Sequence, residues 1–164
     1  MIETVTTARA AAIVGVGYEG LRSYLKRGLL GSVGLMAPFV SRDAPAPDRS
    51  AVRASWSRFG AADLCLMRLA KILIDLGLSF EQANSVVSND SLRNHFKYQT
   101  STDGAVLLAW PPYYDNILFR RDELRHLPDR LAEIGELGVA NILVQLDAVW
   151  QHVHDAMAAE TIKA

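Results

Sequence analysis

A strongly apolar segment near the middle of this 164-residue chain places the tightest constraint on its fold. The segment spans residues 61–76, and after its first four residues it contains only one Arg, one Lys and one Asp. In a helix these three residues would form a narrow polar face. A helix this apolar must be covered on most of its sides, so we expect it at the centre of a domain. Ser79, followed three residues later by Gln82, predicts a capping box at the start of the next helix.

Two short helices are predicted before this core segment. Residues 6–14 form the first, the Gly-Val-Gly sequence at 15–17 breaks it, and residues 18–27 form the second. Leu21, Tyr24 and Leu25 form the apolar stripe of the second helix. Its other side presents Glu19, Arg22, Ser23 and Lys26. Two short helices joined by a glycine-centred turn of three residues are typical of a helix-turn-helix unit.

The segment at 31–55 has a different composition, with three prolines among Ser, Asp and Arg and no sustained period. It predicts a long loop, with short strands at its ends near 35–40 and 52–59. Its basic residues are Arg42, Arg49 and Arg53. They either form an arm that contacts phosphates or keep the loop solvated, and the sequence leaves both interpretations open.

The C-terminal part changes from a helical period to short apolar runs. Residues 91–104 are polar and rich in turn formers, which indicates a linker around a brief helical stretch. The order strand, strand, helix, strand, helix then predicts a small α/β unit at 105–164 with one strand–helix–strand crossover. About 60 residues make a marginal core, so we expect this unit to form a homodimer. The competing interpretation is that it folds back onto the helix at 61–76 and the protein stays monomeric.

Composition and charge narrow the functional classes. The single cysteine, Cys65, excludes an internal disulfide and any multi-cysteine metal centre. The histidines are scattered, so we predict no metal site, no cofactor and no catalytic site, and the chain is not expected to be an enzyme. No apolar run reaches the length of a membrane helix, so we expect a soluble protein. Residues 1–79 carry a net charge of +4 and the remainder −5, which favours contact with a polyanion through the first half.

Three sequence blocks resemble the DNA-binding domain of MerR-type winged-helix regulators. GVGYEGLRSYLKRGLL at 15–30 is similar to the family's G-V-S-x-x-T-L-R-Y-Y-E-x-x-G-L-L, and WSRFGAADL at 56–64 to its Y-R-x-Y-S-x-x-D-L. DLGLSFEQA at 75–83 is similar to D-L-G-x-S-L-x-E-I. The blocks occur in the family's order over residues 4–88. The chain departs from the pattern at Gly20, at Ser23 and at Ser57, which stands in the wing position of the family's arginine beside Arg58.

The resemblance implies an α+β fold, with a MerR-like winged helix-turn-helix domain at 1–90 whose wing loop spans 31–55. The linker at 91–104 and the dimerisation or partner-binding module at 105–164 follow. The long dimerisation helix usual in the family is not expected here, and neither are promoter twisting or metal sensing. In the family, the residues that match Arg22 and Tyr24 contact the nucleic acid. The candidate DNA-binding residues are Thr7, Gly17, Tyr18, Glu19, Arg22, Ser23, Tyr24, Lys26, Arg27, Arg42, Arg53 and Arg58.

The function implied is that of a sequence-specific DNA-binding transcriptional regulator in the bacterial cytoplasm, associated with the nucleoid. Its expected partners are double-stranded DNA, a second copy of the chain and a further transcription or recombination protein, with no membrane. Two alternatives use the same domain. One is an accessory DNA-architectural factor of the excisionase type, and the other is a protein-interaction adaptor that has lost DNA binding.

Overall fold

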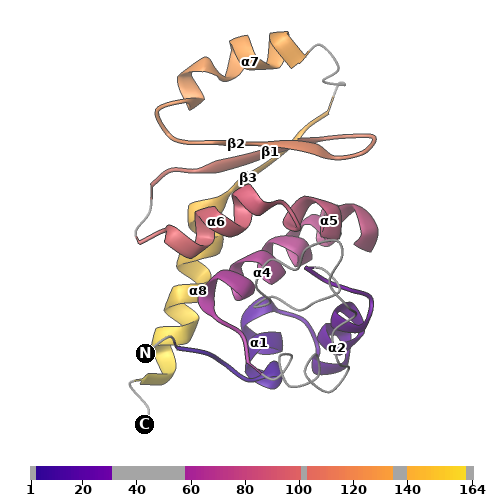
Figure 1. Ribbon diagram of the computed structural model, residues 1–164, viewed down its shortest axis with the longest axis vertical. Helices are drawn as coiled ribbons and strands as arrows, with labels where there is room; N and C mark the ends of the chain where they lie inside the picture. Colours follow the sequence, from indigo (N-terminus) through magenta and orange to yellow (C-terminus); the bar gives the residue numbers. More distant parts are fainter. Residues whose placement is uncertain (1–2, 31–57, 101–102, 135–139, 162–164) are drawn as a thin grey trace, which may run out of the picture.

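The computed structural model describes residues 3–30, 58–100, 103–134 and 140–161, and it shows a mixed α+β protein. The predicted loop at 31–55, with its three arginines Arg42, Arg49 and Arg53, lies outside the described residues, as does the strand predicted near 35–40. Of the strand predicted near 52–59, only residues 58 and 59 are described, and Phe59 forms an isolated antiparallel bridge with Val5. The elements, in chain order, are α1 (Thr7–Val14), α2 (Tyr18–Lys26), α4 (Ala61–Asp75), α5 (Phe80–Val87), α6 (Asp90–Tyr98), β1 (Val106–Trp110), β2 (Asp115–Phe119), η1 (Leu124–His126), α7 (Leu127–Ile134), β3 (Ile142–Gln145) and α8 (Leu146–Thr161). Figure 1 shows α7 on one side of a small sheet and helices α1, α2, α4, α5, α6 and α8 on the other.

Helix α4 lies at the centre of the helical body, as its apolar sequence predicts. Helices α1, α5, α6 and α8 all pack against it, and eight of its fifteen residues are buried. The predicted capping box of α5 is confirmed, because Ser79 Oγ accepts a hydrogen bond from Gln82 N at 3.1 Å and Gln82 Oε1 accepts one from Ser79 N at 2.9 Å. These bonds satisfy two backbone donors that would otherwise lack partners at the helix start.

Helices α1 and α2 are joined by the three-residue turn that the Gly-Val-Gly sequence predicts. Gly15 adopts a left-handed conformation with φ 84°, which glycine tolerates far better than other residues. Arg68 of α4 donates a hydrogen bond to Val14 O at 2.7 Å, directly beside this turn. A Cβ atom on Gly15 would stand 2.7 Å from Arg68 Nη1, so both backbone conformation and space favour glycine there.

The sheet has the strand order β2-β1-β3, and both outer strands are antiparallel to β1. The outer strands therefore run parallel to each other with α7 in their connection, which is the strand–helix–strand crossover predicted from the sequence. Leu107 and Val144 on one face join the main core. Leu108, Trp110 and Phe119 form a second, smaller core with η1 and α7. Each face of the sheet is thus covered by helices.

The segment predicted as a linker contains a packed helix. Leu92 and Phe96 of α6 are buried against the main core, and Asn89 Oδ1 caps the helix by accepting from Ser91 N at 2.8 Å. The brief helical stretch predicted within 91–104 therefore corresponds to α6, and its two buried apolar side chains pack against the main core.

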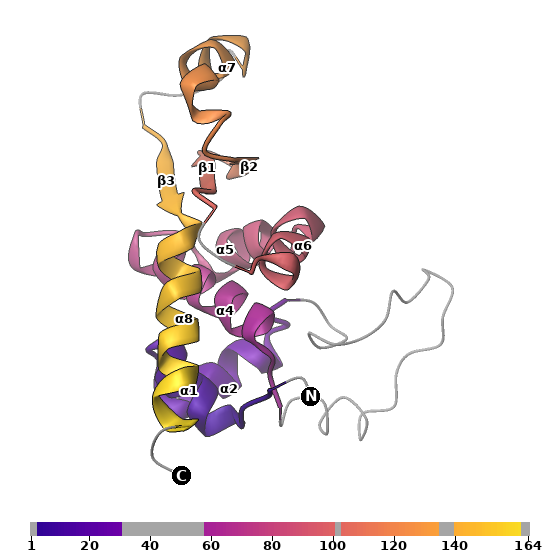
Figure 2. The ribbon, with the colours of Figure 1, turned by 90° about the vertical axis from the view of Figure 1, so that its left-hand side faces the viewer.

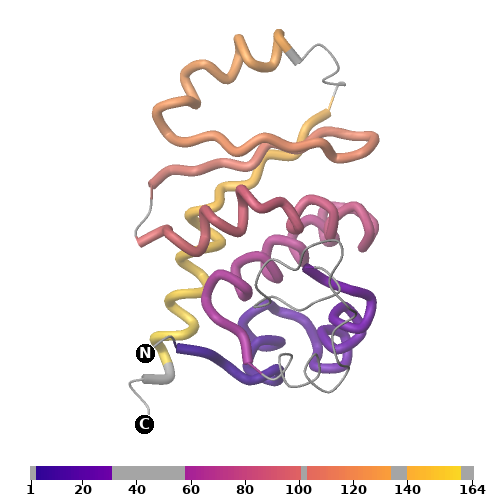
Figure 3. Tube along the Cα trace, in the orientation of Figure 1, coloured from indigo at the N-terminus to yellow at the C-terminus, as the bar shows by residue number. Residues whose placement is uncertain are grey.

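The last helix also belongs to the main core. The chain passes from β3 directly into α8, which runs alongside α4 and α1 (Figures 2 and 3). Val149, Val153 and Met157 are buried there, and Arg9 of α1 donates a hydrogen bond to Ala156 O at 2.7 Å. This packing agrees with the alternative in which the C-terminal unit folds back onto residues 61–76. The homodimer stays a prediction, and among the described residues no helix is long and apolar enough to cross a membrane.

Candidate nucleic-acid interface

Helix α2 presents one polar face to solvent. Leu21 and Leu25 are buried in the main core and fix the orientation of the helix. Gly17 forms its exposed N-cap without a side-chain hydrogen bond. The predicted site residues that this face brings together, all exposed, are Tyr18, Glu19, Arg22, Ser23 and Lys26. The helix is thus held from one side and offers an open row of side chains on the other.

The contacts that Arg22 makes with described polar and aromatic side chains lie within this exposed face. Its Nη1 atom pairs with Glu19 Oε1 at 3.3 Å, and its guanidinium carbon lies 5.6 Å from the centroid of the Tyr18 ring. The two charged side chains are 45% and 79% exposed. An ion pair this exposed is screened by water and contributes about 0–1 kcal/mol to stability. Arg22 can therefore exchange Glu19 for another partner at little cost.

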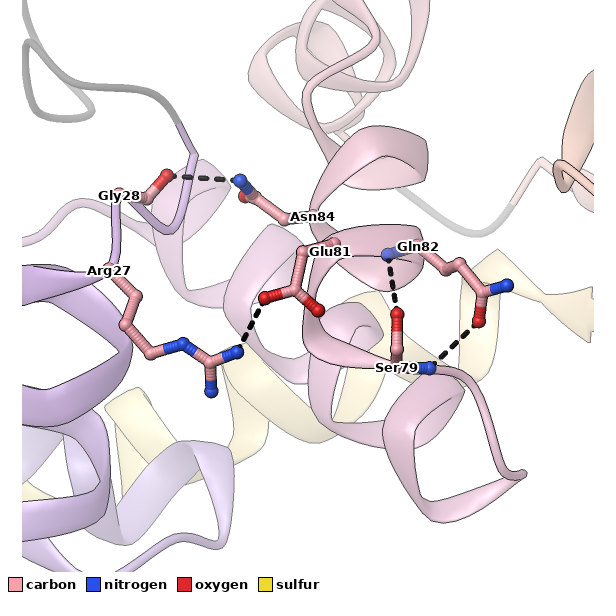
Figure 4. A network of polar contacts seen from close by, with 6 residues as sticks. All are labelled: Arg27, Gly28, Ser79, Glu81, Gln82 and Asn84. Carbon is pink, nitrogen blue, oxygen red and sulfur yellow. Dashed lines mark hydrogen bonds and ion pairs between the residues drawn. The ribbon is translucent and has the colours of Figure 1, made fainter.

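Tyr24, which the resemblance implied as a DNA contact, and the candidate residue Arg27 both contact the neighbouring helix α5. The Tyr24 ring stacks on Phe80 with 5.3 Å between centroids. The Arg27 guanidinium carbon lies 4.0 Å from the Phe80 ring centroid, and its Nη2 atom pairs with Glu81 Oε1 at 2.6 Å (Figure 4). The pKa of the Glu81 carboxyl group is lowered, first by a hydrogen bond from the backbone N–H of Glu81 and then by the hydrogen bond from Arg27. The structure thus gives both residues contacts that orient α2 on α5.

Asn84 of α5 holds the turn that follows α2, a role that sequence reasoning missed. Its Nδ2 atom donates to Gly28 O at 3.1 Å (Figure 4). Its Oδ1 atom accepts from Leu30 N at 2.7 Å. The turn is unusual because Gly28 and Leu30 both have positive φ, at 88° and 65°. One side chain therefore satisfies a donor and an acceptor of a strained turn. The sequence feature that could have indicated this role is an asparagine inside a short helix, because asparagine is a poor helix former.

The two remaining candidate residues that the structure describes, Thr7 and Arg58, lie outside helix α2. Thr7 is the first residue of α1 and is half-buried, while its neighbour Thr6 forms the N-cap and accepts from Arg9 N at 3.4 Å. Arg58 is exposed, next to an isolated antiparallel bridge between Val5 and Phe59. Arg42 and Arg53 lie outside the described residues. Among the described residues, the candidates that the structure brings together are therefore those on the exposed face of α2.

Other chemical features in the described part of the chain are buried or dispersed. Burial raises the pKa of the Cys65 thiol to about 12, so it is protonated and unreactive at neutral pH. Among the described residues, no group of three His, Cys, Asp or Glu side chains could hold a metal ion. A cavity of about 200 Å³ lies between β2 and the η1–α7 segment, at the other end of the molecule from α2 (Figure 1).

Comparison with known proteins gives no relative from which a function could be transferred. No protein-family model matches the chain, and no curated protein matches it either. A functional assignment therefore depends on the residues of the chain itself.

Proposed function

We propose that this protein is a sequence-specific DNA-binding transcriptional regulator of the MerR-like winged-helix type, and that α2 is its recognition helix. The observation that carries the proposal is the exposed row of Tyr18, Arg22, Ser23 and Lys26 on a helix anchored by two buried leucines. A helix of this kind fits the major groove, where arginine pairs with guanine and lysine contacts phosphates. The similarity of the three sequence blocks to MerR-type domains supports the same function, in the nucleoid of a bacterial cell.

The neighbouring helices support the proposal by making α2 rigid. Its two buried leucines lie in the main core and α1 packs against it, while Tyr24 and Arg27 contact α5. A side chain that reads a base must be held close to its productive geometry, which a helix braced on two sides provides. Lys26, in the last turn, makes no ion pair with any described residue, so its charge is available for a phosphate.

A second candidate is a protein-interaction adaptor built on the same helices. It is favoured by the pairing of two arginines of this region with carboxylates, Arg22 with Glu19 and Arg27 with Glu81. These pairs reduce the positive potential that attracts DNA. Salt dependence separates the two functions, because contacts with phosphates give binding that weakens steeply as salt rises.

The test is binding of the full chain to duplexes selected from a randomised DNA pool, measured by fluorescence anisotropy across salt concentrations. We expect Arg22→Ala to weaken binding to the best site by about 1–3 kcal/mol, because it removes a base contact. Its thermal unfolding should hardly change, since the side chain is exposed and its ion pair is weak.

The matched control is Arg130→Ala on α7. Arg130 has the same kind of exposed pair with a glutamate three residues away, at 3.4 Å, but lies at the opposite end of the molecule (Figure 1). This variant should bind DNA like the parent. Equal losses in the two variants, or none in Arg22→Ala, would show that α2 is not the recognition helix. Genome-wide mapping of bound sites then separates a regulator, found at promoters, from an excisionase-like factor, found at attachment sites.

A further inference from the structure

An acidic side chain stands in the middle of the surface proposed to face DNA. Glu19 lies in the first turn of α2, and its side chain is 79% exposed. A carboxylate close to the phosphate backbone is repelled, so on electrostatic grounds alone this position disfavours DNA binding. Within the described residues Glu19 pairs only with Arg22. In a complex in which Arg22 contacts a base, Glu19 therefore needs a hydrogen-bond donor on the DNA that compensates for this repulsion.

The spacing of Glu19 and Arg22 matches the spacing of neighbouring base pairs. Residues three apart on a helix are separated by about 4.5 Å along its axis. Successive base pairs are separated by about 3.4 Å. Recognition helices in the major groove commonly read successive bases with side chains three residues apart. The two side chains can therefore address adjacent base pairs from one face of α2.

The chemistry of the two groups defines which bases they recognise. Arginine donates to O6 and N7 of guanine, whereas a carboxylate accepts from the N4 amino group of cytosine. We infer that Glu19 is a specificity-determining residue that reads a cytosine, and that Arg22 reads a guanine in the adjacent base pair. The target of the protein then contains two adjacent G·C pairs at the centre of its contact with α2. This inference rests on the proposed function, since it requires α2 to enter the major groove.

The pair of residues also explains how the site discriminates. In the free protein, Glu19 and Arg22 neutralise each other at 3.3 Å. At a correct site each exchanges its partner for a base edge, whereas at a wrong site the carboxylate meets the DNA without a donor. Glu19 thereby penalises incorrect sequences more than it strengthens correct ones, which is how a repulsive element creates specificity.

The substitution Glu19→Gln tests this inference. Glutamine removes the negative charge and prefers adenine, because its amide pairs with N6 and N7 of that base. We expect two effects of opposite sign. Binding to a random duplex becomes tighter, and the preferred base at one position changes from cytosine to adenine, with about tenfold weaker discrimination in favour of cytosine.

The experiment selects duplexes from a randomised pool with the parent chain, with Glu19→Gln and with Glu133→Gln as the matched control. Glu133 forms the corresponding exposed pair with Arg130 on α7, so its substitution removes the same charge far from α2. Affinities are then measured on duplexes that differ at a single base pair. Unchanged folding of Glu19→Gln is verified by thermal unfolding, as expected for an exposed side chain.

The outcomes separate this inference from the proposed function. A change of preferred base in Glu19→Gln alone supports the reading of cytosine. If Glu19→Gln binds every duplex more tightly but keeps the base preferences of the parent, Glu19 only holds Arg22 and the inference is wrong, while DNA recognition by α2 stands. A parent chain that enriches no sequence and binds no duplex overturns the proposed function and the inference together.

Discussion

Replacement of Met157 by alanine tests whether the C-terminal helix is part of the main core. Met157 lies in the last third of α8 and is only 7% exposed, in the same cluster as residues of α1 and α4. Truncation of a buried methionine to alanine costs about 2–5 kcal/mol, and we expect the lower part of this range because the site retains slight exposure. A loss of about 2–3 kcal/mol corresponds to a fall in Tm of about 4–12 °C for a chain of this size.

The assay is urea unfolding of the full chain, followed by tryptophan fluorescence and by far-UV circular dichroism. Trp150 lies on α8, so its fluorescence contributes a signal from this helix, whereas circular dichroism reports all of the helices. If α8 forms one core with α1 and α4, tryptophan fluorescence and circular dichroism change together in a single transition. The whole transition should move to lower urea in Met157→Ala.

The control is Leu143→Ala on the edge strand β3. Leu143 is 49% exposed, so its truncation should cost under about 1 kcal/mol. Two separate transitions in the parent would show that the C-terminal unit folds independently of the α4 core, and would refute the reasoning. A midpoint for Met157→Ala equal to that for Leu143→Ala would likewise refute the reasoning.

Two further predictions concern the half-buried Asn84 and the buried Asp63. Asn84→Ala removes both hydrogen bonds to the turn after α2, so we expect the free energy of unfolding in urea to fall by about 1–3 kcal/mol. The control Asn94→Ala, on the exposed side of α6, should change it by less than about 0.5 kcal/mol. Equal urea midpoints for the two variants would refute the role of Asn84. Burial raises the pKa of Asp63, although the hydrogen bond from Gly60 N and the nearby Arg93 both act to lower it. The folded parent therefore binds this proton more tightly than the unfolded chain does, and its free energy of unfolding falls as the pH rises from about 4 through the raised pKa. Asp63→Asn keeps an acceptor for Gly60 N and should remove this loss, and a constant difference in unfolding midpoint between variant and parent from pH 4 to pH 7 would contradict the assignment.

The sequence by itself determined the elements whose signals are local. The apolar composition of 61–76 required a buried helix, and α4 is the centre of the core. Ser79 and Gln82 specified the start of α5 through contacts three residues apart, and Gly15 specified the end of α1. In each case the interacting groups lie within one helical turn, where spacing along the chain defines spacing in space.

Only the tertiary structure decided which face of α2 is free and where the C-terminal helix packs. Tyr24 and Arg27 have residue types that suit DNA, yet both lie against α5, and Arg27 meets Glu81 across 54 positions of sequence. Asn84 reaches Gly28 across 56 positions, and Arg9 reaches Ala156 across 147. Helical periodicity identifies an apolar face but not the surface that covers it, because many surfaces of similar size and polarity could do so. The choice among them depends on how all of the helices fit together, and this is why only the tertiary structure shows α6 and α8 packed in the main core.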